Sequence, residues 1–447
     1  MLLLKEIVMK TRMIHMSPPQ TLISVFILFI TLGTFLLKLP SATSNGITFI
    51  DALFTATSAM TVTGLVVIDT GTAFTLFGQV IILVLIQVGG LGIMTFAVLI
   101  YMVLGKKIGI KERLLIQQAL NQTSLGGVIR LVRKLFIFSI TIETFAVVFL
   151  SLRWVPEMGM AKGIYASIFH SISAFNNAGF SIWSDSLSAY AVDPLVNIVI
   201  TLLFIIGGIG FTVVFDLWKS KEFYHLSLHT KIMLVGTLCI NVVSLFMIFI
   251  LEYNNPDTIA DFSTLGKLQA AYFQAVTPRT AGFNSIDISQ MEESSLFYML
   301  MLMFIGGGST STAGGIKLST ALIIVLASIT FFRQKEHVTL YRRSFHFHLI
   351  MRALALTVGS VGVVFLGTFV LNLSEDAPFL MILFETISAF GTVGLSMGLT
   401  GQLTLIGKLT LIFIMLVGKL GPLTFAFAFA RYKPDPVKYP NEDVLTG

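Results

Sequence analysis

Long hydrophobic stretches separated by short polar segments run along the 447 residues of the chain. A helix needs about 20 apolar residues to cross a lipid bilayer, and this chain supplies many stretches of that kind. The clearest cover residues 21–37, 76–104, 135–150, 198–218, 232–251 and 403–430. Too little polar sequence remains to cover these helices in water. The pattern therefore predicts an all-α polytopic membrane protein.

Four further hydrophobic stretches, of about ten residues each, are too short to span a bilayer. They cover residues 50–60, 164–175, 268–276 and 379–390, and each leads into a small polar segment that contains glycine. The four segments are Thr61, Val62, Thr63 and Gly64; Asn176, Asn177, Ala178 and Gly179; Arg279, Thr280, Ala281 and Gly282; and Gly391, Thr392, Val393 and Gly394. A Ser-Ala pair precedes three of them, at 58–59, 173–174 and 388–389. We predict short pore helices, each followed by a loop.

The glycines that end these segments recur at intervals of 115, 103 and 112 residues. A second glycine cluster follows each one at a nearly constant offset, at residues 89–92, 207–210, 306–308 and 418–421. Two features that recur four times in one order predict four repeats of helix, pore helix and helix, arranged with pseudo-fourfold symmetry around one pore. The repeats are expected at residues 21–104, 132–219, 230–330 and 348–431.

Such repeats suit the conduction of cations. A short helix that enters the membrane points its partially negative C-terminal end inward. The carbonyl oxygens of the following loop can then replace the water around a cation, as in potassium-channel filters. Glycine permits the backbone angles that turn successive carbonyls toward one axis. We therefore expect the four glycine segments to form a selectivity filter that binds K+ at its carbonyls. For the second glycine clusters we prefer the alternative, close helix packing.

The second helix of the third repeat, expected at residues 299–330, contains ten small or polar residues in a row. These are Gly306, Gly307, Gly308, Ser309, Thr310, Ser311, Thr312, Ala313, Gly314 and Gly315. Such a run makes a poor helix in lipid, where every backbone polar group needs a partner. Because it follows the third filter segment on the cytoplasmic side, it predicts a gate across the pore. The alternative is a distorted helix buried against its neighbours.

Charged residues at membrane depth are candidates for functional sites. Lys419 stands in the second glycine cluster of the fourth repeat and could hold the carbonyls of the gate or oppose ion passage. Lys317 is grouped with the gate, although extension toward the cytoplasmic interface is its simpler interpretation. Arg279 is expected to be a surface group that bonds loop carbonyls. Structural pairing is expected for Glu143, Asp216 and Glu385.

Composition and charge agree with a membrane protein. Hydrophobic residues make up 55% of the chain and charged residues 12%, against about 25% charged in soluble domains. The net charge of +6 could suggest nucleic acid, but 21 of the 29 Lys and Arg fall in five segments, which alternate with acidic ones. The five segments are 1–20, 105–134, 219–231, 331–352 and 431–447. The positive-inside rule then predicts a multi-pass protein of the cell membrane. The N-terminus (1–20), the loops 105–131 and 331–347 and the tail (432–447) are expected in the cytoplasm, with no nucleic acid partner.

The four repeats, the filter glycines and the glycine-serine-threonine break resemble the Trk/Ktr/HKT superfamily of potassium transporters, and the bacterial Ktr-type membrane subunits most. By this resemblance residues 306–317 match an intramembrane gating loop and Lys419 the basic position that faces it. The resemblance implies a homodimer with one pore per protomer and a cytoplasmic ring of RCK-type regulatory subunits, which alone would bind nucleotide. It also implies sodium-stimulated potassium uptake, no covalently bound cofactor, and, with Gly64 at the first filter position, a preference for potassium.

Other functions fit these residues less well than a potassium transporter does. A proton- or sodium-coupled secondary transporter also uses repeats and broken helices, but the filter segments offer no ionisable relay. An intramembrane enzyme would use Ser309 or Ser311 as nucleophile and His170 as base, yet the chain has neither G-x-S-x-G nor H-E-x-x-H. The stretch from Gly401 to Lys408 departs from the spacing of a Walker A motif. A pore subunit without catalytic residues is the preferred prediction.

Overall fold

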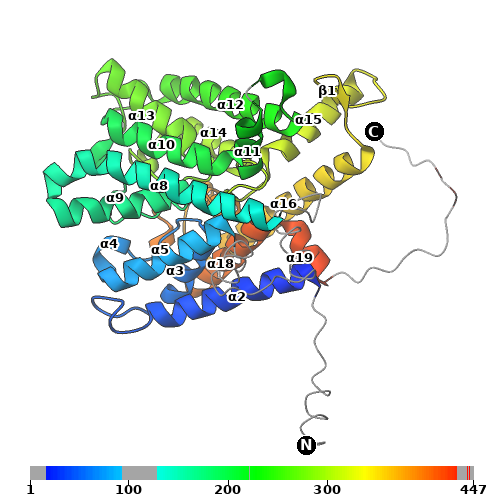
Figure 1. Ribbon diagram of the computed structural model, residues 1–447. Coiled ribbons are helices and arrows are strands. Elements are labelled where there is room, and N and C mark those ends of the chain that lie inside the picture. Colours follow the sequence, from blue (N-terminus) through cyan, green and yellow to red (C-terminus); the bar gives the residue numbers. More distant parts are fainter. Residues whose placement is uncertain (1–16, 93–127, 221, 430–439, 441, 443–447) are drawn as a thin grey trace, which may run out of the picture.

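The computed structural model describes residues 17–92, 128–220 and 222–429, together with residues 440 and 442 (Figure 1). The regular elements of the described residues are helices and one short antiparallel hairpin, in which β1 (Thr339–Leu340) pairs with β2 (Arg343–Ser344). Residues 93–104 of the first repeat, residues 105–127 of the predicted cytoplasmic loop 105–131 and nearly all of the two predicted cytoplasmic termini lie outside the described residues. Residues 128–131 of that loop already belong to a helix.

The described helices form four groups with the same order: a long outer helix, a short helix and an inner helix. The first two groups are α2 (Pro18–Leu37), α3 (Phe49–Thr61) and α5 (Leu76–Leu91), then α8 (Val128–Met158), α9 (Met160–Phe175) and α10 (Pro194–Ile209) with α11 (Phe211–Lys219). The last two are α12 (Leu228–Glu252), α13 (Thr264–Val276) and α14 (Glu293–Phe304) with α15 (Leu318–Phe332), then α16 (Phe347–Ser374), α17 (Phe379–Gly391) and α18 (Leu405–Leu420) with α19 (Pro422–Phe429). The short connecting helices are α4 (Thr70–Ala73), η1 (Ser188–Tyr190), η2 (Phe223–His225), η3 (Ile288–Gln290) and η4 (Thr400–Gln402). All four stretches predicted as short helices are helical.

Side-chain caps fix where many of these helices begin. Thr75 and Thr404 occupy the same position before the inner helices α5 and α18, and each hydroxyl accepts the backbone N–H three residues ahead. Asp193 does the same for α10 and accepts from two backbone N–H groups. Such caps satisfy N–H groups that would otherwise lack a partner, and each stabilises its helix by about 1 kcal/mol.

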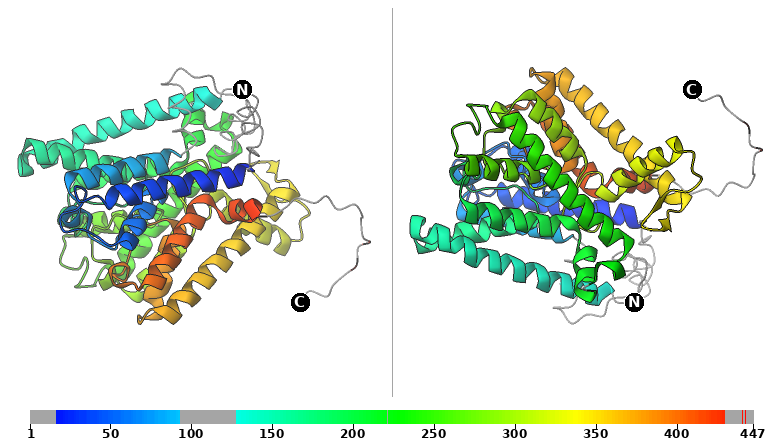
Figure 2. Two further views of the ribbon diagram at one scale, coloured as in Figure 1. Left: turned by 90° about the horizontal axis from the view of Figure 1, so that it is seen from below. Right: turned by 90° about the horizontal axis from the view of Figure 1, so that it is seen from above.

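The repeats close into a ring because the inner helix of each repeat packs against the short helix of the next (Figure 2). Thus α5 contacts α9, α10 contacts α13, α14 contacts α17, and α18 returns to contact α3. At the closing seam the ammonium of Lys408 on α18 lies 2.8 Å from a carboxylate oxygen of Asp51 on α3. Gln20 on α2 also donates to the carbonyl of Ala428 on α19, at 2.8 Å. The four short helices therefore surround one centre.

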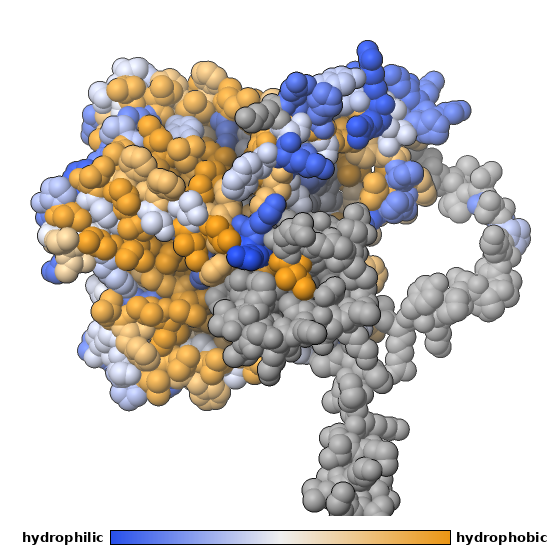
Figure 3. Space-filling model, in the orientation of Figure 1, coloured by the Kyte–Doolittle hydropathy of each residue, from blue (hydrophilic) through white to orange (hydrophobic). Residues whose placement is uncertain are grey.

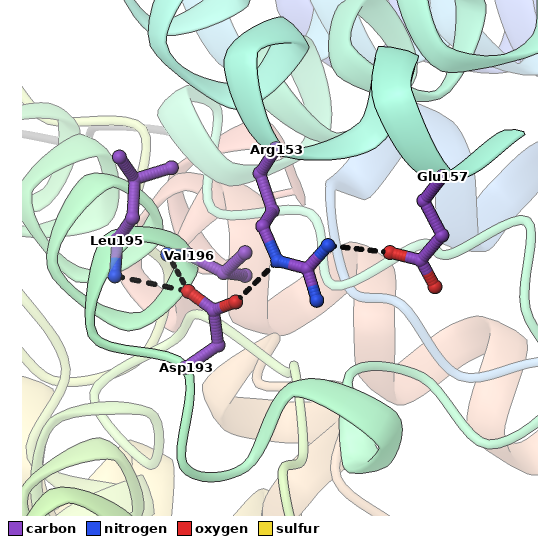
Figure 4. Close-up of polar contacts among 5 residues, drawn as sticks. All are labelled: Arg153, Glu157, Asp193, Leu195 and Val196. Carbon is purple, nitrogen blue, oxygen red and sulfur yellow. Dashed lines mark hydrogen bonds and ion pairs between the residues drawn. The ribbon is translucent and has the colours of Figure 1, made fainter. Parts of the chain in front are cut away.

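At one end of the molecule, charged side chains join α8 to α10 (Figure 4). Arg153 donates to Glu157 one turn along α8, at 2.8 Å, and to Asp193 at the start of α10, at 2.6 Å. Asp193 also accepts the N–H groups of Leu195 and Val196. Arg153 is well exposed, so these pairs contribute little stability. They link the end of α8 to the first turn of α10.

The outside of the bundle is apolar. Among the described helices, α2, α8, α12 and α16 are long and apolar enough to cross a membrane, and each bent pair α10–α11 and α18–α19 would make one further span. Large side chains such as Leu28, Phe145, Phe246 and Phe365 on the outer helices are more than half exposed. Broad hydrophobic areas cover the helices in Figure 3, and hydrophilic residues gather at the end that carries the β1–β2 hairpin. A lipid environment accounts for this surface.

Two predicted spans are not single helices. Residues 198–218 and 403–430 were expected to be continuous, but the chain turns by 91° between α10 and α11 and by 94° between α18 and α19. The first break lies at Gly210, where the N–H of Phe211 bonds Thr310 in the third repeat instead of the preceding helical turn. The second lies at Gly421, ahead of Pro422, which has no N–H to continue the helix. Gly92 at the end of α5 has a similar positive φ of 86°.

Candidate functional site

A hydroxyl residue at or near the end of each short helix lies two or three positions before the polar glycine segment. Its backbone carbonyl accepts the N–H of the residue just before the segment's glycine, at 2.8–3.0 Å. The four pairs are Ser58 with Thr63, Ser173 with Ala178, Thr277 with Ala281, and Ser388 with Val393. Three of these hydroxyl residues belong to the Ser-Ala pairs. The fourth, Thr277, lies five residues before Gly282, whereas the three serines lie six residues before their glycines, so the spacing alone does not single it out.

The backbone of each segment is left-handed at two positions. The glycines Gly64, Gly179, Gly282 and Gly394 have φ between 67° and 95°. The second left-handed residue lies two positions before each glycine: Val62, Asn177, Thr280 and Thr392, with φ between 51° and 71°. A β-branched residue rarely adopts such angles, and each strained position costs about 1–3 kcal/mol. Repetition of this strain in all four segments points to a functional constraint.

The four glycines meet in a closed ring. A Cβ built on each glycine would contact or overlap the carbonyl oxygen that precedes the glycine of the next repeat. Gly64 faces Ala178, Gly179 faces Ala281, Gly282 faces Val393, and Gly394 faces Thr63. Because the last repeat returns to the first, the backbone oxygens of four chain segments converge around one axis, and no side chain fits between them.

The hydroxyls at the helix ends hold this ring in two ways. Those of Ser58 and Ser388 accept the N–H of Gly64 and Gly394, both at 3.1 Å. The hydroxyl of Ser173 instead donates to the carbonyl of Phe180, just beyond Gly179, at 2.7 Å. Thr277 donates in the same way to Phe283, at 2.5 Å. Repeats one and four thus share one arrangement, and repeats two and three share the other.

The first side chain of the second segment, that of Asn176, points to neighbouring helices. Asn176 donates to Gln87 on α5 at 2.6 Å, and Gln87 donates to Glu143 on α8 at 3.0 Å. Glu143 therefore has an amide partner, and the structural pairing expected for it is present. The sequence analysis did not identify Gln87. This residue bonds Glu143, which lies 56 positions further along the chain, and Asn176, which lies 89 positions further.

The expectation for Arg279 was wrong. Its side chain is only 8% exposed and lines a small cavity with Thr237, Asn241 and Gly307 instead of lying on the surface. Its guanidinium donates to Asn241 on α12 at 3.4 Å, not to loop carbonyls. The short helix α13 ends just before this residue, so the chain turns and carries the side chain behind the third segment.

The predicted break in the third repeat is confirmed, because α14 ends at Phe304 and α15 begins at Leu318. Two backbone hydrogen bonds join the two ends of the loop between them, which we call its neck. The N–H of Gly306 bonds the carbonyl of Ile316 at 2.8 Å, and the N–H of Leu318 bonds that of Gly307 at 3.1 Å. Residues 308–315 therefore form a loop that leaves the helix and returns to it at nearly the same point.

This loop lies against the glycine ring and the second repeat. The N–H of Gly308 bonds the carbonyl of Gly208 on α10 at 2.7 Å. The hydroxyl of Thr312 donates to Asn177 in the second segment at 3.1 Å. A Cβ on Gly314 would overlap the side chain of Thr392 in the fourth segment. The loop thus contacts segments of two other repeats.

Two ammonium groups bind adjacent carbonyls of the loop. Lys419 on α18 donates to Thr312, and Lys317 donates to Ala313, both at 2.5 Å. Of the two interpretations of Lys419, this contact fits the one in which it holds the loop. The expectation that Lys317 extends toward the cytoplasm was wrong. Its side chain instead donates to a carbonyl of the loop, where irregular backbone needs hydrogen-bond partners.

The second glycine clusters provide close packing, as expected. A Cβ on Gly89, Gly207 or Gly418 would overlap the carbonyl of the last or next-to-last residue of the short helix in the same repeat. These carbonyls belong to Met60, Phe175 and Phe390. The inner helices thereby approach the ring more closely than side chains would permit.

The other singled-out polar residues have partners of their own. Asp216 accepts from Ser227 and Thr230 at the start of α12. His170 bonds Ala166 and Ser181, whereas Ser311 bonds Gly308, so His170 and Ser311, weighed above as base and nucleophile, do not bond each other. Among the described residues no group of three or more His, Cys, Asp or Glu is placed to hold a metal. The oxygen atoms gathered at the ring belong to the backbone.

Comparisons with known proteins agree on one family. A family model described as TrkH, cation transport protein, matches residues 8–438. The chain is 56% identical to the Ktr system potassium uptake protein B of Bacillus subtilis over 97% of this chain and 98% of that protein. It is 44% identical to the protein of the same name from Vibrio alginolyticus, over 96% and 95% of the two chains. It is 38% identical to the potassium/sodium uptake protein NtpJ of Enterococcus hirae, over 97% and 98%.

A solved structure shares the fold. The potassium transporter TrkH from Vibrio parahaemolyticus superposes with a TM-score of 0.75 over 94% of this chain and 86% of that one, at 20% sequence identity. The likeness shows that four repeats around one centre are the architecture of this chain.

Proposed function

Because the chain belongs to the TrkH family of cation transport proteins, we propose that it is the ion-conducting membrane subunit of a potassium uptake system. The observation that carries the proposal is the ring of four left-handed glycines, in which backbone oxygens from all four repeats converge. Carbonyl oxygens in such a ring replace the hydration shell of a monovalent cation. Two of the relatives described above are named as potassium uptake proteins of Ktr systems.

The ion path in this proposal runs through the ring, where K+ is the substrate, and then meets the loop 306–317. Lys317 and Lys419 hold the loop across the path by binding its carbonyls. The names of the Ktr relatives refer to a system, which supports a partner subunit. We propose a homodimer with one pore per protomer and a cytoplasmic RCK-type ring that binds the nucleotide. Sodium stimulation and a potassium preference belong to the same proposal.

Transport by the purified protein in liposomes tests the function. With K+ and Na+ varied separately, uptake is expected to follow the K+ gradient and to show a lower apparent affinity for Na+ as the transported ion. Flux that requires an opposing proton gradient would instead support a coupled secondary transporter. No K+ flux from inserted, folded protein, with or without its regulatory subunit, would contradict the proposal.

The orientation in the membrane can be tested by cysteine labelling in a variant that lacks Cys239. Segments 105–134, 219–231 and 331–352 are expected to be cytoplasmic, and 185–193 and 252–261 external. The structure supports a common side for two of them, since Lys231 lies 5.6 Å from the ring centre of Phe223 and 5.9 Å from that of Tyr341. Labelling of residues in 331–352 by an impermeant reagent outside intact cells would overturn this topology.

A further inference from the structure

A second layer of polar contacts lies behind the glycine ring. One helical turn before the hydroxyl residue of each short helix, repeats two to four carry a polar side chain that is 0% exposed: His170, Gln274 and Glu385. Each of these side chains bonds a serine just beyond the filter glycine of its own repeat. The pairs are His170 with Ser181 at 3.0 Å, Gln274 with Ser285 at 3.5 Å, and Glu385 with Ser396 at 2.8 Å.

In the fourth repeat the contact is made by a carboxyl group, which has two hydroxyl partners. The carboxylate of Glu385 accepts from the hydroxyls of both Ser396 and Thr400. Within the described part of the chain it forms no salt bridge, so hydroxyl donors are what compensate its burial. Removal of either hydroxyl would leave a fully buried carboxyl oxygen without its partner, which is costly. The segment beyond Gly394 is therefore tied firmly to α17.

In the second repeat an imidazole takes the same place. The Nδ1 of His170 lies 2.8 Å from the carbonyl of Ala166, which can only accept, so Nδ1 carries the proton. Nε2 of the neutral ring is then left to accept from the hydroxyl of Ser181. Trp183 stacks on the ring, with 4.2 Å between the ring centres, and fixes its plane. Different residues thus make the same contact in repeats two and four.

The first repeat lacks this layer. Thr55 stands at the corresponding position of α3, and its buried hydroxyl has no partner among the described residues. Val66, two residues after Gly64, offers no hydroxyl. The loop beyond the first filter glycine is therefore held without the tie that the other three repeats have.

We propose that His170, Gln274 and Glu385 are positioning residues for ion selection, which fix the backbone just outside the filter glycine. In repeats two to four the helix-end hydroxyl holds the chain at or next to the glycine, and the polar tie holds it two or three residues beyond the glycine. Together the two anchors set the direction of the filter carbonyls, so their loss would let the ring adapt to a smaller ion. The inference rests on the proposed potassium function and extends it.

Ser396→Ala removes the tie with little change in volume. In liposome flux the ratio of apparent affinities for K+ and Na+ is expected to fall about tenfold, because a buried polar group that loses its hydrogen-bond partner costs about one such factor. Ser181→Ala is expected to lower the ratio less, because its contact with His170 is longer, 3.0 Å against 2.8 Å. Ser396→Thr keeps the hydroxyl and should retain the wild-type ratio. Thr55→Val in the first repeat is the matched control, since it changes the same helix position where no tie exists.

The outcomes separate this inference from the proposed function. A wild-type ratio in folded, transporting Ser396→Ala would overturn the positioning role. An equal fall in Thr55→Val would also overturn it, because the effect would then come from general packing of the short helices. If the wild-type protein itself carries no K+, the proposed function fails. The wild-type flux, measured beside the variants, therefore distinguishes this failure from a failure of the positioning role.

Discussion

Alanine in place of Gly64, Gly282 or Gly394 is expected to abolish most of the preference for potassium over sodium. Each of these glycines has a positive φ, and the added Cβ would overlap the carbonyl oxygen that precedes the glycine of the next repeat. A residue with a side chain in this conformation costs about 1–3 kcal/mol, and each 1.4 kcal/mol is about tenfold in binding. The ring must move outward, and the carbonyls then no longer fit K+. Serine at these positions is expected to act in the same way.

The structure also predicts an order among the four glycines. A Cβ on Gly179 would lie 3.0 Å from the carbonyl oxygen of Ala281, whereas the corresponding oxygen would be nearer at the other three positions. Gly179→Ala is therefore expected to have the mildest effect of the four. Apparent affinities for K+ and Na+, measured by flux in liposomes, test both the loss and the order.

Gly46→Ala serves as the matched control for this series. Gly46 has a φ of 71°, which resembles that of the filter glycines, but a Cβ there meets nothing within 4 Å. This variant carries the backbone strain without the steric overlap and should keep the wild-type preference. Unchanged affinity and preference in all four filter variants would show that the ring is not the selectivity filter.

The sequence predicted the features of this site that are local or repeated. Glycine before a large apolar residue marked the ring in all four repeats, because left-handed backbone at a crowded axis excludes other residues. The run 306–315 marked the break between α14 and α15, since its small and polar residues offer few side chains to stabilise a helix in lipid. Both signals come from the residue types themselves.

The features that the sequence did not predict depend on contacts between repeats. The turn at Gly210 arises because Thr310 in the third repeat accepts the N–H of Phe211. Nothing in residues 198–218 announces that contact. Arg279 was misplaced for a similar reason, because its partner Asn241 lies on another helix, 38 residues away. Repetition shows which residues are equivalent, but not which neighbour each one meets.

Lys419→Gln is expected to raise potassium flux and to make it depend less on a regulatory subunit. The ammonium of Lys419 holds the loop by donating to the carbonyl of Thr312 at 2.5 Å. A buried carbonyl that loses its hydrogen-bond donor costs roughly 1–3 kcal/mol, and each 1.4 kcal/mol is about tenfold in an equilibrium. Loss of this bond should therefore increase a small open fraction by about tenfold. Glutamine is shorter than lysine and uncharged, so it does not restore the contact.

Shortening the loop tests the same gate without removing a charge. The bonds between Gly306 and Ile316 and between Gly307 and Leu318 close the neck, so Gly307 can be joined to Gly315 with little movement of α14 and α15. Deletion of residues 308–314 removes the contacts with α10 and with the ring. Flux is expected to rise further than in Lys419→Gln. The ratio of apparent K+ and Na+ affinities should stay near the wild-type value, because the four glycines remain in place.

Lys408→Gln is the control for charge on the same helix. Lys408 also lies on α18 and forms an ion pair, but its partner Asp51 is on α3 and does not belong to the loop. This variant should leave the flux of inserted protein at the wild-type level.

The loop has little side-chain bulk to hold it, so local opening depends mainly on its few polar contacts. If the shortened protein inserts and folds but its flux stays at the wild-type level, the loop does not close the pore, and its contacts with the ring serve only to pack the third repeat.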